Sequence, residues 1–414
     1  MNNLTATKTS FILSKGTGVK CLIFDDTTKT ILSNLIPHSK FLDSDFFLFE
    51  SIENRNKQKL ENISCVVVIS PDSIKKLIEE ITDPSYGTYI VLFTNTVDGL
   101  MLEMLARNDF YEVVEEVHEI YLDYYKQEER LFTVGSGGLY AFMMSLGNIP
   151  TIYYMKKLSN LAEELNTKLS FSNLKEGGEL YMFDRSFDML TPLLYDWKYQ
   201  GMIKQFMNYD NQIVSYEGKL YDLTDKFFQE NKFKDMSEVS EEINKMVKTV
   251  EAKKKIKKLS LEEIRELSQL SQTIDKHMSI HKAILNEGLK ILEISEMEYE
   301  IIQKKPNKKE IERIISNKEV EEKARKKLMK ISSFKKEDYK FKKDMDPKIG
   351  YIPPIIKEGK KNLEVIKERL NKGRYKVIYF HGGVTLREYR ELVEREPNII
   401  VIADKIVTYN DFVD

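Results

Sequence analysis

Short apolar runs alternate with amphipathic segments along the first 130 residues. The runs that predict buried strands are Cys21 to Phe24, Phe46 to Phe49, Cys65 to Ile69 and Tyr89 to Phe93. Apolar positions at helical spacing predict helices from Asp72 to Ile81 and from Phe110 to Tyr125. Short all-apolar strands separated by helices are typical of a parallel sheet covered on both faces. The pattern therefore predicts an α/β layer.

A Gly-rich break from Gly135 to Gly138 leads into a predicted helix from Leu139 to Leu146. Strands and helices then alternate to about residue 207, and this stretch includes the buried run Leu180 to Phe183. Strand signals are nearly absent from about 213 to 346, where Glu- and Lys-rich helical spacing dominates. The helices predicted there are Glu241 to Lys255, Ser260 to Leu270, Gln272 to Leu289 and Lys308 to Ile314.

Two strand-like runs, Val377 to Phe380 and Ile399 to Ile402, return near the end of the chain. Each is too short to form a sheet alone, so both are expected to complete the sheet that holds Leu180 to Phe183. The helical stretch would then be an insertion. We expect an N-terminal α/β domain over 1–131, a discontinuous central α/β domain over 132–212 and 347–414, and a helical inserted domain over 213–346.

Composition indicates a globular, cytoplasmic protein. Hydrophobic residues make up 42% of the chain, no apolar run approaches the length of a membrane span, and the first residues lack the order of a signal peptide. Cys21 and Cys65 lie in apolar runs, which is typical of buried free thiols in a reducing compartment.

Charge is unevenly distributed although the net charge is only −2. Residues 71–130 hold 5 basic and 14 acidic residues, a balance of −9, and residues 301–370 hold 22 and 12, a balance of +10. A basic region suits nucleic acid, anionic lipid or an acidic protein. Lys and Glu are interleaved here without aromatic residues at stacking intervals, so we expect a solvated helix face and no nucleic-acid partner.

Motifs that would support an enzyme are incomplete. His381-Gly382-Gly383 follows a strand-like run, as the oxyanion loop of a hydrolase would, but the chain has no Gly-x-Ser-x-Gly elbow. Gly382 and Gly383 more simply permit a tight turn from strand to helix. The cluster at Gly135 lacks the spacing of a dinucleotide or Walker A loop.

A metal site is equally unsupported by the sequence. His277 and His281 have a spacing that can hold zinc, but no third ligand is evident, which favours helix-surface or capped histidines. We therefore expect no enzyme, no catalytic residue, no cofactor and no metal.

The segment from Asp184 to Gln200, DRSFDMLTPLLYDWKYQ, follows the buried run that ends at Phe183. Asp184 and Arg185 end the strand because neither charge is stable when buried without a partner. Pro192 then forces a turn. These residues favour a salt-bridged corner that pins a helix to the sheet edge. The alternative, a catalytic carboxylate pair, has no nucleophile or metal ligand beside it.

This segment closely resembles the signature of the SM family, the syntaxin-binding Sec/Munc-type regulators of membrane fusion. The matching residues are Asp184, Arg185, Asp188, Thr191, Pro192, Leu193, Tyr199 and Gln200. Further matches follow in chain order, at Gly18 to Asp25, Phe47 to Ile52, Asp83 to Asn95 and Val377 to Tyr389, which includes Gly382 and Gly383. Trp197 and the acidic segment Glu112 to Tyr125 resemble the branch that serves endosomal and trans-Golgi syntaxins.

The resemblance implies an arch-shaped multi-domain α/β protein, with two parallel-sheet domains and a mainly helical insertion. It implies a protein that binds a syntaxin-type SNARE, promotes SNARE complex assembly in endosomal and trans-Golgi transport, and associates peripherally with membranes through partners, tethering factors among them. The alternatives are an SM-like protein of a secretory, Golgi or vacuolar step, or a reduced tethering scaffold without syntaxin binding.

The resemblance also implies binding residues. In the family, a syntaxin N-terminal peptide enters an apolar pocket whose matching positions here are Leu102, Val114 and Val117, with Glu119 at an acidic rim. Val114 and Val117 share one face of the predicted helix. The alternative is that these side chains are simply core. Arg55 matches a basic contact to the syntaxin bundle in the cleft, and the alternative is an ordinary exposed loop arginine.

The chain departs from the family in its helical insertion. It is shorter than the family's usual size, and most of the loss falls in that region. Between Leu267 and Ser271 it lacks the Tyr-Pro-x-aromatic element that the family often carries in its helical hairpin. The resemblance therefore does not imply that this chain holds the vesicle-side SNARE helix as a template during assembly.

Overall fold

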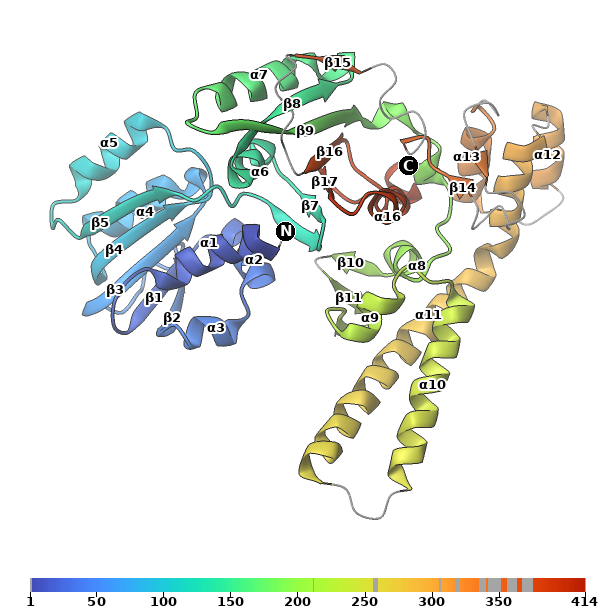
Figure 1. The fold of residues 1–414 in the computed structure, drawn as a ribbon, viewed down its shortest axis with the longest axis horizontal. Coiled ribbons are helices and arrows are strands. Elements are labelled where there is room, and N and C mark those ends of the chain that lie inside the picture. The colour runs from blue at the N-terminus through green and yellow to red at the C-terminus, as the bar shows by residue number, and fades with distance from the viewer. Residues whose placement is uncertain are drawn as a thin grey trace. The chain divides into compact units, whose positions relative to one another are not determined.

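The computed structural model describes residues 2–210, 212–255, 260–304, 307–316, 321–334, 340–341, 351–355, 363–366 and 375–413. The chain folds into two compact units (Figure 1). The first contains Met1–Phe183, Leu363–His381 and Asn398–Asp404. The second contains Asp184–Asn362, Gly382–Pro397 and Lys405–Asp414.

The first unit holds a five-stranded parallel sheet in the order β2-β1-β3-β4-β5. Its strands are β1 (Lys20–Phe24), β2 (Phe46–Ser51), β3 (Leu60–Ile69), β4 (Tyr86–Phe93) and β5 (Val114–Glu119). The four strands expected from apolar runs are thus confirmed as β1 to β4. Cys21 and Cys65 face each other on β1 and β3 as buried free thiols.

Helices cover both faces of this sheet. They are α1 (Asn2–Ser14), α2 (Asp26–Leu35), α3 (His38–Leu42), α4 (Ile74–Thr82) and α5 (Gly99–Asn108). Residues of α1 and α2 pack with Leu22 and Val66 in one core, and residues of α4 and α5 pack with Ile23 and Val67 in another. Side chains alternate between the faces of a strand, so neighbouring strand residues feed two separate cores.

The helix predicted from Phe110 to Tyr125 is wrong, because this segment contains β5 instead. Its apolar positions three residues apart imitate a helical period. Val114 and Val117 are β-branched and favour a strand when a partner strand is available. The edge of β4 supplies that partner.

A second, seven-stranded sheet lies in the same unit, in the order β15-β8-β9-β16-β17-β7-β6. Its strands are β6 (Tyr125–Glu128), β7 (Leu131–Thr133), β8 (Asn148–Tyr154), β9 (Lys175–Asp184), β15 (Glu364–Val365), β16 (Lys376–His381) and β17 (Ile399–Ala403). Helices α6 (Gly138–Leu146) and α7 (Ser159–Ser170) accompany them. β9 and β16 are neighbours, which confirms that the strand ending near Phe183 and the strand at Val377 share one sheet.

The second unit is mainly helical. Its principal helices are α8 (Tyr199–Phe206), α9 (Lys226–Asn231), α10 (Met236–Lys254), α11 (Leu261–Lys304), α12 (Lys308–Ser316), α13 (Glu322–Ile331) and α16 (Leu386–Arg395). The segments predicted as two helices, Ser260 to Leu270 and Gln272 to Leu289, are parts of the single helix α11. Figure 1 shows α10 and α11 as a long hairpin, and Val250, Leu267 and Ile274 pack in a core of its own.

The expectation of almost no strands from about 213 to 346 is wrong near both ends of that range. At its start, β10 (Asn208–Asp210), β11 (Ile213–Tyr216) and β12 (Lys219–Asp222) form an antiparallel sheet. Near its end, β13 (Lys340–Phe341) pairs with β14 (Tyr351–Ile352). The Glu217-Gly218 pair turns β11 into β12, and both residues have positive φ, as a tight hairpin requires. Within the described ranges, no helix is both long and apolar enough to cross a membrane. The three-domain division stays a prediction.

Candidate functional site

A groove lies between α5 and the edge strand β5 of the first sheet. The side chains that line it are Phe93, Val97, Leu102, Leu105, Ala106, Asp109, Glu112, Val114, Val117, His118 and Glu119. Its volume of about 780 Å³ is large enough for several side chains. The groove therefore brings together all four residues that the sequence analysis grouped as a peptide pocket.

A β-bulge explains why Val114 and Val117 share a face although they lie on a strand. Tyr89 of β4 pairs with Val114 and Ile90 pairs with Glu116, so Glu115 is an extra residue between them. Side chains alternate along a strand, and one inserted residue restores two positions three apart to the same side. The sequence analysis was right that Val114 and Val117 share a face, but it placed them on a helix instead of a bulged strand.

Exposure separates this groove from a closed core. Val117 is 42% exposed, and Leu102 and Val114 are partly buried, whereas Leu105 beneath them is 3% exposed. An apolar side chain of a partner would therefore find apolar walls that remain open to solvent. The binding role of these residues stays a prediction.

Glu119 is held in place by the groove wall. One carboxylate oxygen accepts a hydrogen bond from the Val97 backbone N–H at 2.9 Å. The other accepts one from the Tyr121 hydroxyl at 2.7 Å. Burial, together with the hydrogen bond to Glu119, raises the pKa of Tyr121, so this hydroxyl remains a donor at neutral pH.

Sequence reasoning missed Leu105, Ala106, Asp109, Glu112 and His118 of the groove. Asp109 ends α5, and its carboxylate accepts hydrogen bonds from the N–H groups of Val113 and Val114 at 2.9 and 3.0 Å. The β-branched content of the segment was the available signal for a strand. A strand predicted from Val114 onward would have placed Asp109 and Glu112 in the turn before it, beside the groove.

Arg55 lies in the loop between β2 and β3, far from the groove in the sequence. Its guanidinium contacts Glu79 at 3.1 Å, and its side chain is 83% exposed. This geometry is that of a solvated surface pair. The proposed contact of Arg55 with a syntaxin bundle stays a prediction.

The signature residues form a buried cluster inside the second unit. Arg185 donates two hydrogen bonds to Glu388 of α16, at 2.8 and 2.7 Å, and a further bond to the backbone oxygen of Asp188. Glu388 also accepts from the backbone N–H of Thr385 and so closes a capping box at the start of α16. The salt-bridged corner expected from the sequence is present.

Asp188 and Asp184 each fix a turn of the signature. Asp188 accepts from the backbone N–H groups of Leu190 and Thr191, both at 3.0 Å, and from the Thr191 hydroxyl. Pro192 follows at the start of a short 3-10 helix, Thr191–Leu193. Burial and the nearby Glu388 raise the pKa of Asp188 to about 6, against the opposing effect of Arg185. Asp184 accepts from the Ser186 N–H at 3.0 Å.

The two glycines after β16 are required by close packing. Gly382 and Gly383 have φ of 86° and 113°, and an added Cβ on Gly383 would lie 2.4 Å from the Cγ1 of Val407. A Cβ on Gly382 would lie 3.0 Å from the Cβ of Arg185. The interpretation of this pair as a tight turn with close backbone approach is confirmed.

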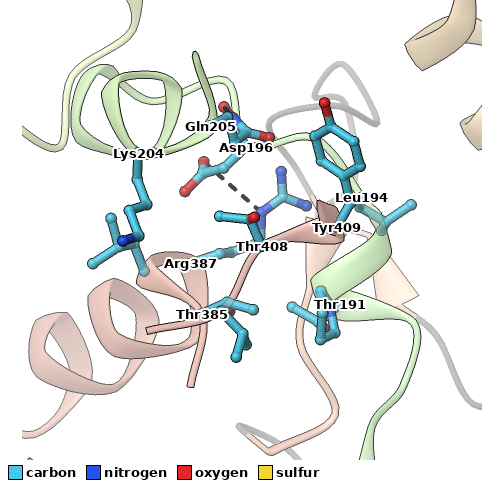
Figure 2. Close-up of a pocket in the computed structure, with 13 residues that line it drawn as sticks. Thr191, Leu194, Asp196, Lys204, Gln205, Thr385, Arg387, Thr408 and Tyr409 are labelled. Carbon is cyan, nitrogen blue, oxygen red and sulfur yellow. Dashed lines mark hydrogen bonds and ion pairs between the residues drawn. The ribbon is translucent and has the colours of Figure 1, made fainter. Parts of the chain in front are cut away.

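Figure 2 shows the pocket beside the signature, where Asp196 and Arg387 point toward one another. Arg390 also contacts Asp196, at 3.0 and 3.2 Å. Burial raises the pKa of Asp196, but Arg390 and Arg387 outweigh burial and hold it below its usual value. The pocket measures only about 20 Å³, which is room for one water molecule rather than a ligand.

The aromatic end of the signature anchors α11. Trp197 donates to the Ser295 hydroxyl at 2.9 Å, and the Tyr199 hydroxyl lies 2.9 Å from Nδ1 of His277. Gln200 donates to the hydroxyl of Tyr209 at 3.2 Å. The hydrogen bonds of Trp197 and Tyr199 attach the signature segment to α11.

His277 is buried, so the expectation of a helix-surface or capped position is wrong for it. Its Nε2 lies 3.1 Å from the Asp225 carboxylate, because α9 packs there. His281 lies 3.1 Å from the backbone oxygen of Met236. Among the described residues, no three His, Cys, Asp or Glu side chains are grouped to hold a metal ion.

His381 at the end of β16 tests the hydrolase alternative. Its Nδ1 lies 3.0 Å from Asp404 and 3.3 Å from the Tyr379 hydroxyl. Within the described part of the chain, no serine hydroxyl or cysteine thiol is hydrogen-bonded to its ring.

Comparison with known proteins agrees with this fold. The Sec1 family model matches residues 20–372. Vacuolar protein sorting-associated protein 45 of Dictyostelium discoideum is 27% identical over 277 residues, which cover 57% of this chain and 49% of that protein. The Homo sapiens protein of the same name is 26% identical over 292 residues, or 60% and 51%. The chain spans about half the length of the curated relatives it matches.

Solved structures show the same fold. The SM protein Vps45 in complex with the Qa SNARE Tlg2 gives a TM-score of 0.81 at 21% identity, covering 99% of this chain and 96% of that chain. A chain of the Unc18–syntaxin 1 complex from Monosiga brevicollis gives a TM-score of 0.83 at 15% identity, covering 100% of this chain and 98% of that chain. The family match extends over most of the residues discussed above, from β1 through the signature to the helical hairpin. The chain therefore belongs to the Sec1 family, the family of the SM proteins.

Proposed function

We propose that this chain is a non-enzymatic SM-type regulator that binds a syntaxin-type SNARE and promotes SNARE complex assembly in endosomal and trans-Golgi transport. The observation that carries the proposal is the α5–β5 groove, where Leu102, Val114 and Val117 form open apolar walls beside carboxylates. Such a groove fits a peptide with one bulky apolar side chain and a nearby basic residue.

The comparisons support the choice of partner. Relatives named vacuolar protein sorting-associated protein 45 match in several organisms. Structures of similar fold include Vps45 with the Qa SNARE Tlg2, and Sly1p with an N-terminal peptide of Sed5p. The proposal extends to a cytoplasmic location, with peripheral association at endosomal and Golgi membranes through the SNARE and tethering factors.

The proposed function is to position SNARE helices for assembly. Holding one helix bundle against another lowers the entropic cost of bringing SNARE helices together, and no bond is made or broken. We also propose the domain division at 131, 212 and 346, and a contact of Arg55 with the bound syntaxin.

A groove variant tests the central proposal. Val117→Lys places a charge without a partner on an apolar wall and should weaken binding of a syntaxin N-terminal peptide by about 1–3 kcal/mol. The side chain is 42% exposed, so folding should survive. Titration calorimetry measures the affinity, and circular dichroism checks the fold.

The result also separates the alternatives. A folded wild-type chain that binds no syntaxin cytosolic region would support the tethering scaffold instead. Preference for a secretory or vacuolar syntaxin over an endosomal one would move the protein to another transport step. Unchanged peptide affinity in folded Val117→Lys would remove the groove from the proposal.

The helix α11 offers a specific observation for a second binding role. Met278, Leu285 and Leu292 recur at seven-residue spacing and are 49%, 44% and 36% exposed. Apolar residues every seven positions lie along one side of a helix, as one of the two apolar positions of a coiled-coil heptad does. We propose that this stripe receives a second SNARE helix, although the hairpin lacks the Tyr-Pro-x-aromatic element.

A further inference from the structure

Helix α5 is apolar on nearly all sides, although little of it is buried. Its sequence is GLMLEMLARN, and Leu105 is the one residue of this helix that is buried. Leu102, Leu105 and Ala106 lie on the side that lines the groove. A helix that is apolar all round is normally enclosed by protein. The side of α5 turned away from the groove therefore lacks, among the described residues, the cover expected of such a helix.

The uncovered side of α5 carries a mixed stripe of apolar and charged residues. Leu100, Glu103, Met104 and Arg107 have the spacing that places side chains along one side of a helix. Leu100 is 71% exposed and Met104 is 47% exposed. Glu103 and Arg107 form an ion pair with each other, and both side chains are more than half exposed. All four side chains of the stripe are thus open to a partner.

Two aromatic residues, Phe110 and Tyr111, follow in the turn between α5 and β5, and both are exposed. Aromatic residues and methionine are enriched in protein interfaces, where methionine adapts its shape to a partner. Apolar residues scattered singly are normal on a surface, whereas a group of them marks an interaction site. We call this group the α5 face, and it consists of Leu100, Glu103, Met104, Arg107, Phe110 and Tyr111.

The charges of the α5 face complement themselves. It carries one acidic and one basic side chain, Glu103 and Arg107, four residues apart on the helix. When two copies of α5 meet antiparallel about a two-fold axis, Glu103 of each copy can lie opposite Arg107 of the other. The same axis brings Leu100 of each copy toward the Phe110 end of the other. Each contact then occurs twice, as an isologous interface requires.

The surroundings of the α5 face disfavour an anionic membrane as its partner. Residues 71–130 hold 5 basic and 14 acidic residues, a balance of −9. Anionic lipid headgroups attract clusters of Lys and Arg, and they repel a surface of this charge. A second copy is also repelled at long range, but salt at about 0.1 M screens that repulsion within about 10 Å. The contact between two α5 faces is itself apolar and matched in charge.

We propose that the α5 face is the interface of a homodimer, in which two α5 helices pack antiparallel with Glu103 and Arg107 paired across the two-fold axis. The peptide groove lies on the other side of α5, so it stays accessible in both copies. A stable interface has roughly 20–30 residues on each side, and the α5 face is much smaller, so the dimer is weak and depends on protein concentration. This inference does not rest on the proposed function, because self-association needs no peptide.

The experiment reverses the two charges one at a time in the full chain. Glu103→Arg gives the helix two basic residues, and Arg107→Glu gives it two acidic residues. Either variant alone sets like charges opposite each other in the dimer. A mixture of the two variants restores opposite charges, and so does the double variant that carries both changes. Analytical ultracentrifugation over a concentration series measures association, and circular dichroism checks the fold.

Two further variants complete the design. Leu100→Ser combined with Met104→Ser removes the apolar part of the stripe at exposed positions. Glu164→Arg is the matched control, because Glu164 and Lys168 form an exposed ion pair at the same spacing on α7. This control changes the net charge of the chain as Glu103→Arg does, but at a site away from the α5 face.

We expect the wild type to dimerise reversibly. Each single charge variant should associate with itself about tenfold more weakly than the wild type, because like charges meet across the axis. The mixture of the two variants and the double variant should each recover most of the lost affinity. The serine variant should lose self-association, because the apolar contact is removed. Glu164→Arg should dimerise as the wild type does.

Three results would overturn the inference. A wild-type chain that stays monomeric at every concentration would assign the α5 face to a different partner. Charge variants that associate as tightly as the wild type would place the interface elsewhere. A mixture that associates no better than either variant alone would exclude the antiparallel pairing. Val117→Lys, which tests the peptide groove, should leave self-association unchanged, so this inference and the proposed function fail separately.

Discussion

Arg185 and Glu388 are joined by two parallel hydrogen bonds of 2.8 and 2.7 Å, although 203 residues separate them in the chain. Arg185 directly follows β9 and is the second residue of the signature segment. Glu388 lies in α16, which follows Gly382 and Gly383. The two sequence motifs are therefore halves of one buried feature. Both side chains are under 10% exposed, so neither charge has water as an alternative partner.

The first prediction concerns this pair. Glu388→Gln should lower the free energy of unfolding by about 3–5 kcal/mol, because it leaves a buried guanidinium without its counter-charge. Urea denaturation followed by circular dichroism measures the change. Glu103→Gln is the control, since the Glu103–Arg107 pair is exposed and its loss should cost no more than about 0.5 kcal/mol. Equal, small effects of both variants would show that the buried pair is not a structural joint.

Lys327 of α13 occupies a second buried polar site in the same unit. Its ammonium lies 3.2 Å from the ring centroid of Tyr195 and 4.4 Å from that of Tyr409, and it pairs with Glu298 of α11. Burial lowers the pKa of Lys327 to about 8, although Glu298 acts to raise it. Burial likewise raises the pKa of Glu298.

The second prediction follows from the sign of the Lys327 shift. Between about pH 8 and pH 10 the folded state has lost this proton while the unfolded state still holds it, so stability rises with pH across that window. The gain relative to the double variant Lys327→Met with Glu298→Leu should reach about 1 kcal/mol per pH unit at most. Guanidinium titrations at several pH values measure it. A flat or falling difference would contradict the assigned burial of the charge.

The third prediction tests the turn after β16. Gly383→Ala should destabilise the protein by more than about 1 kcal/mol, because its φ of 113° is unfavourable for alanine and the new Cβ would meet Val407. Gly99→Ala is the matched change at the start of α5, where a Cβ meets nothing within 4 Å. That control should be neutral or slightly stabilising. Thermal melts measure the stability of both variants. Equal melting temperatures would show that the loss of a glycine, and not the close approach of Val407, determines the cost.

The fourth prediction concerns the apolar stripe of α11. Serine at Met278, Leu285 and Leu292 together should lower the free energy of unfolding much less than three changes at fully buried positions would, since these side chains are 49%, 44% and 36% exposed. The triple variant should bind a vesicle-side SNARE helix at least tenfold more weakly, because the apolar seam is lost. Ile284→Ser, at a fully buried position of the same helix, should instead destabilise the fold. Retained helix binding in the folded triple variant would exclude the stripe as a binding surface.

The sequence alone determined the parts of this protein whose cause is local. The run from Cys65 to Ile69 is apolar throughout because β3 is covered on both faces. Asp188, Pro192 and the paired glycines specify turns through their own backbone and side-chain chemistry. The resemblance to a known family named Leu102, Val114 and Val117, and these side chains do meet in one groove.

The tertiary structure decided what depends on a distant partner. Residues 114–119 form a strand because the edge of β4 is available for pairing, and the bulge at Glu115 then turns Val114 and Val117 to one side. The partner of Arg185 is Glu388 because folding brings chain segments about two hundred residues apart into contact. No local pattern encodes the bonds from Val97 and Tyr121 that occupy Glu119, because those bonds exist only once the segments that flank β5 are packed together.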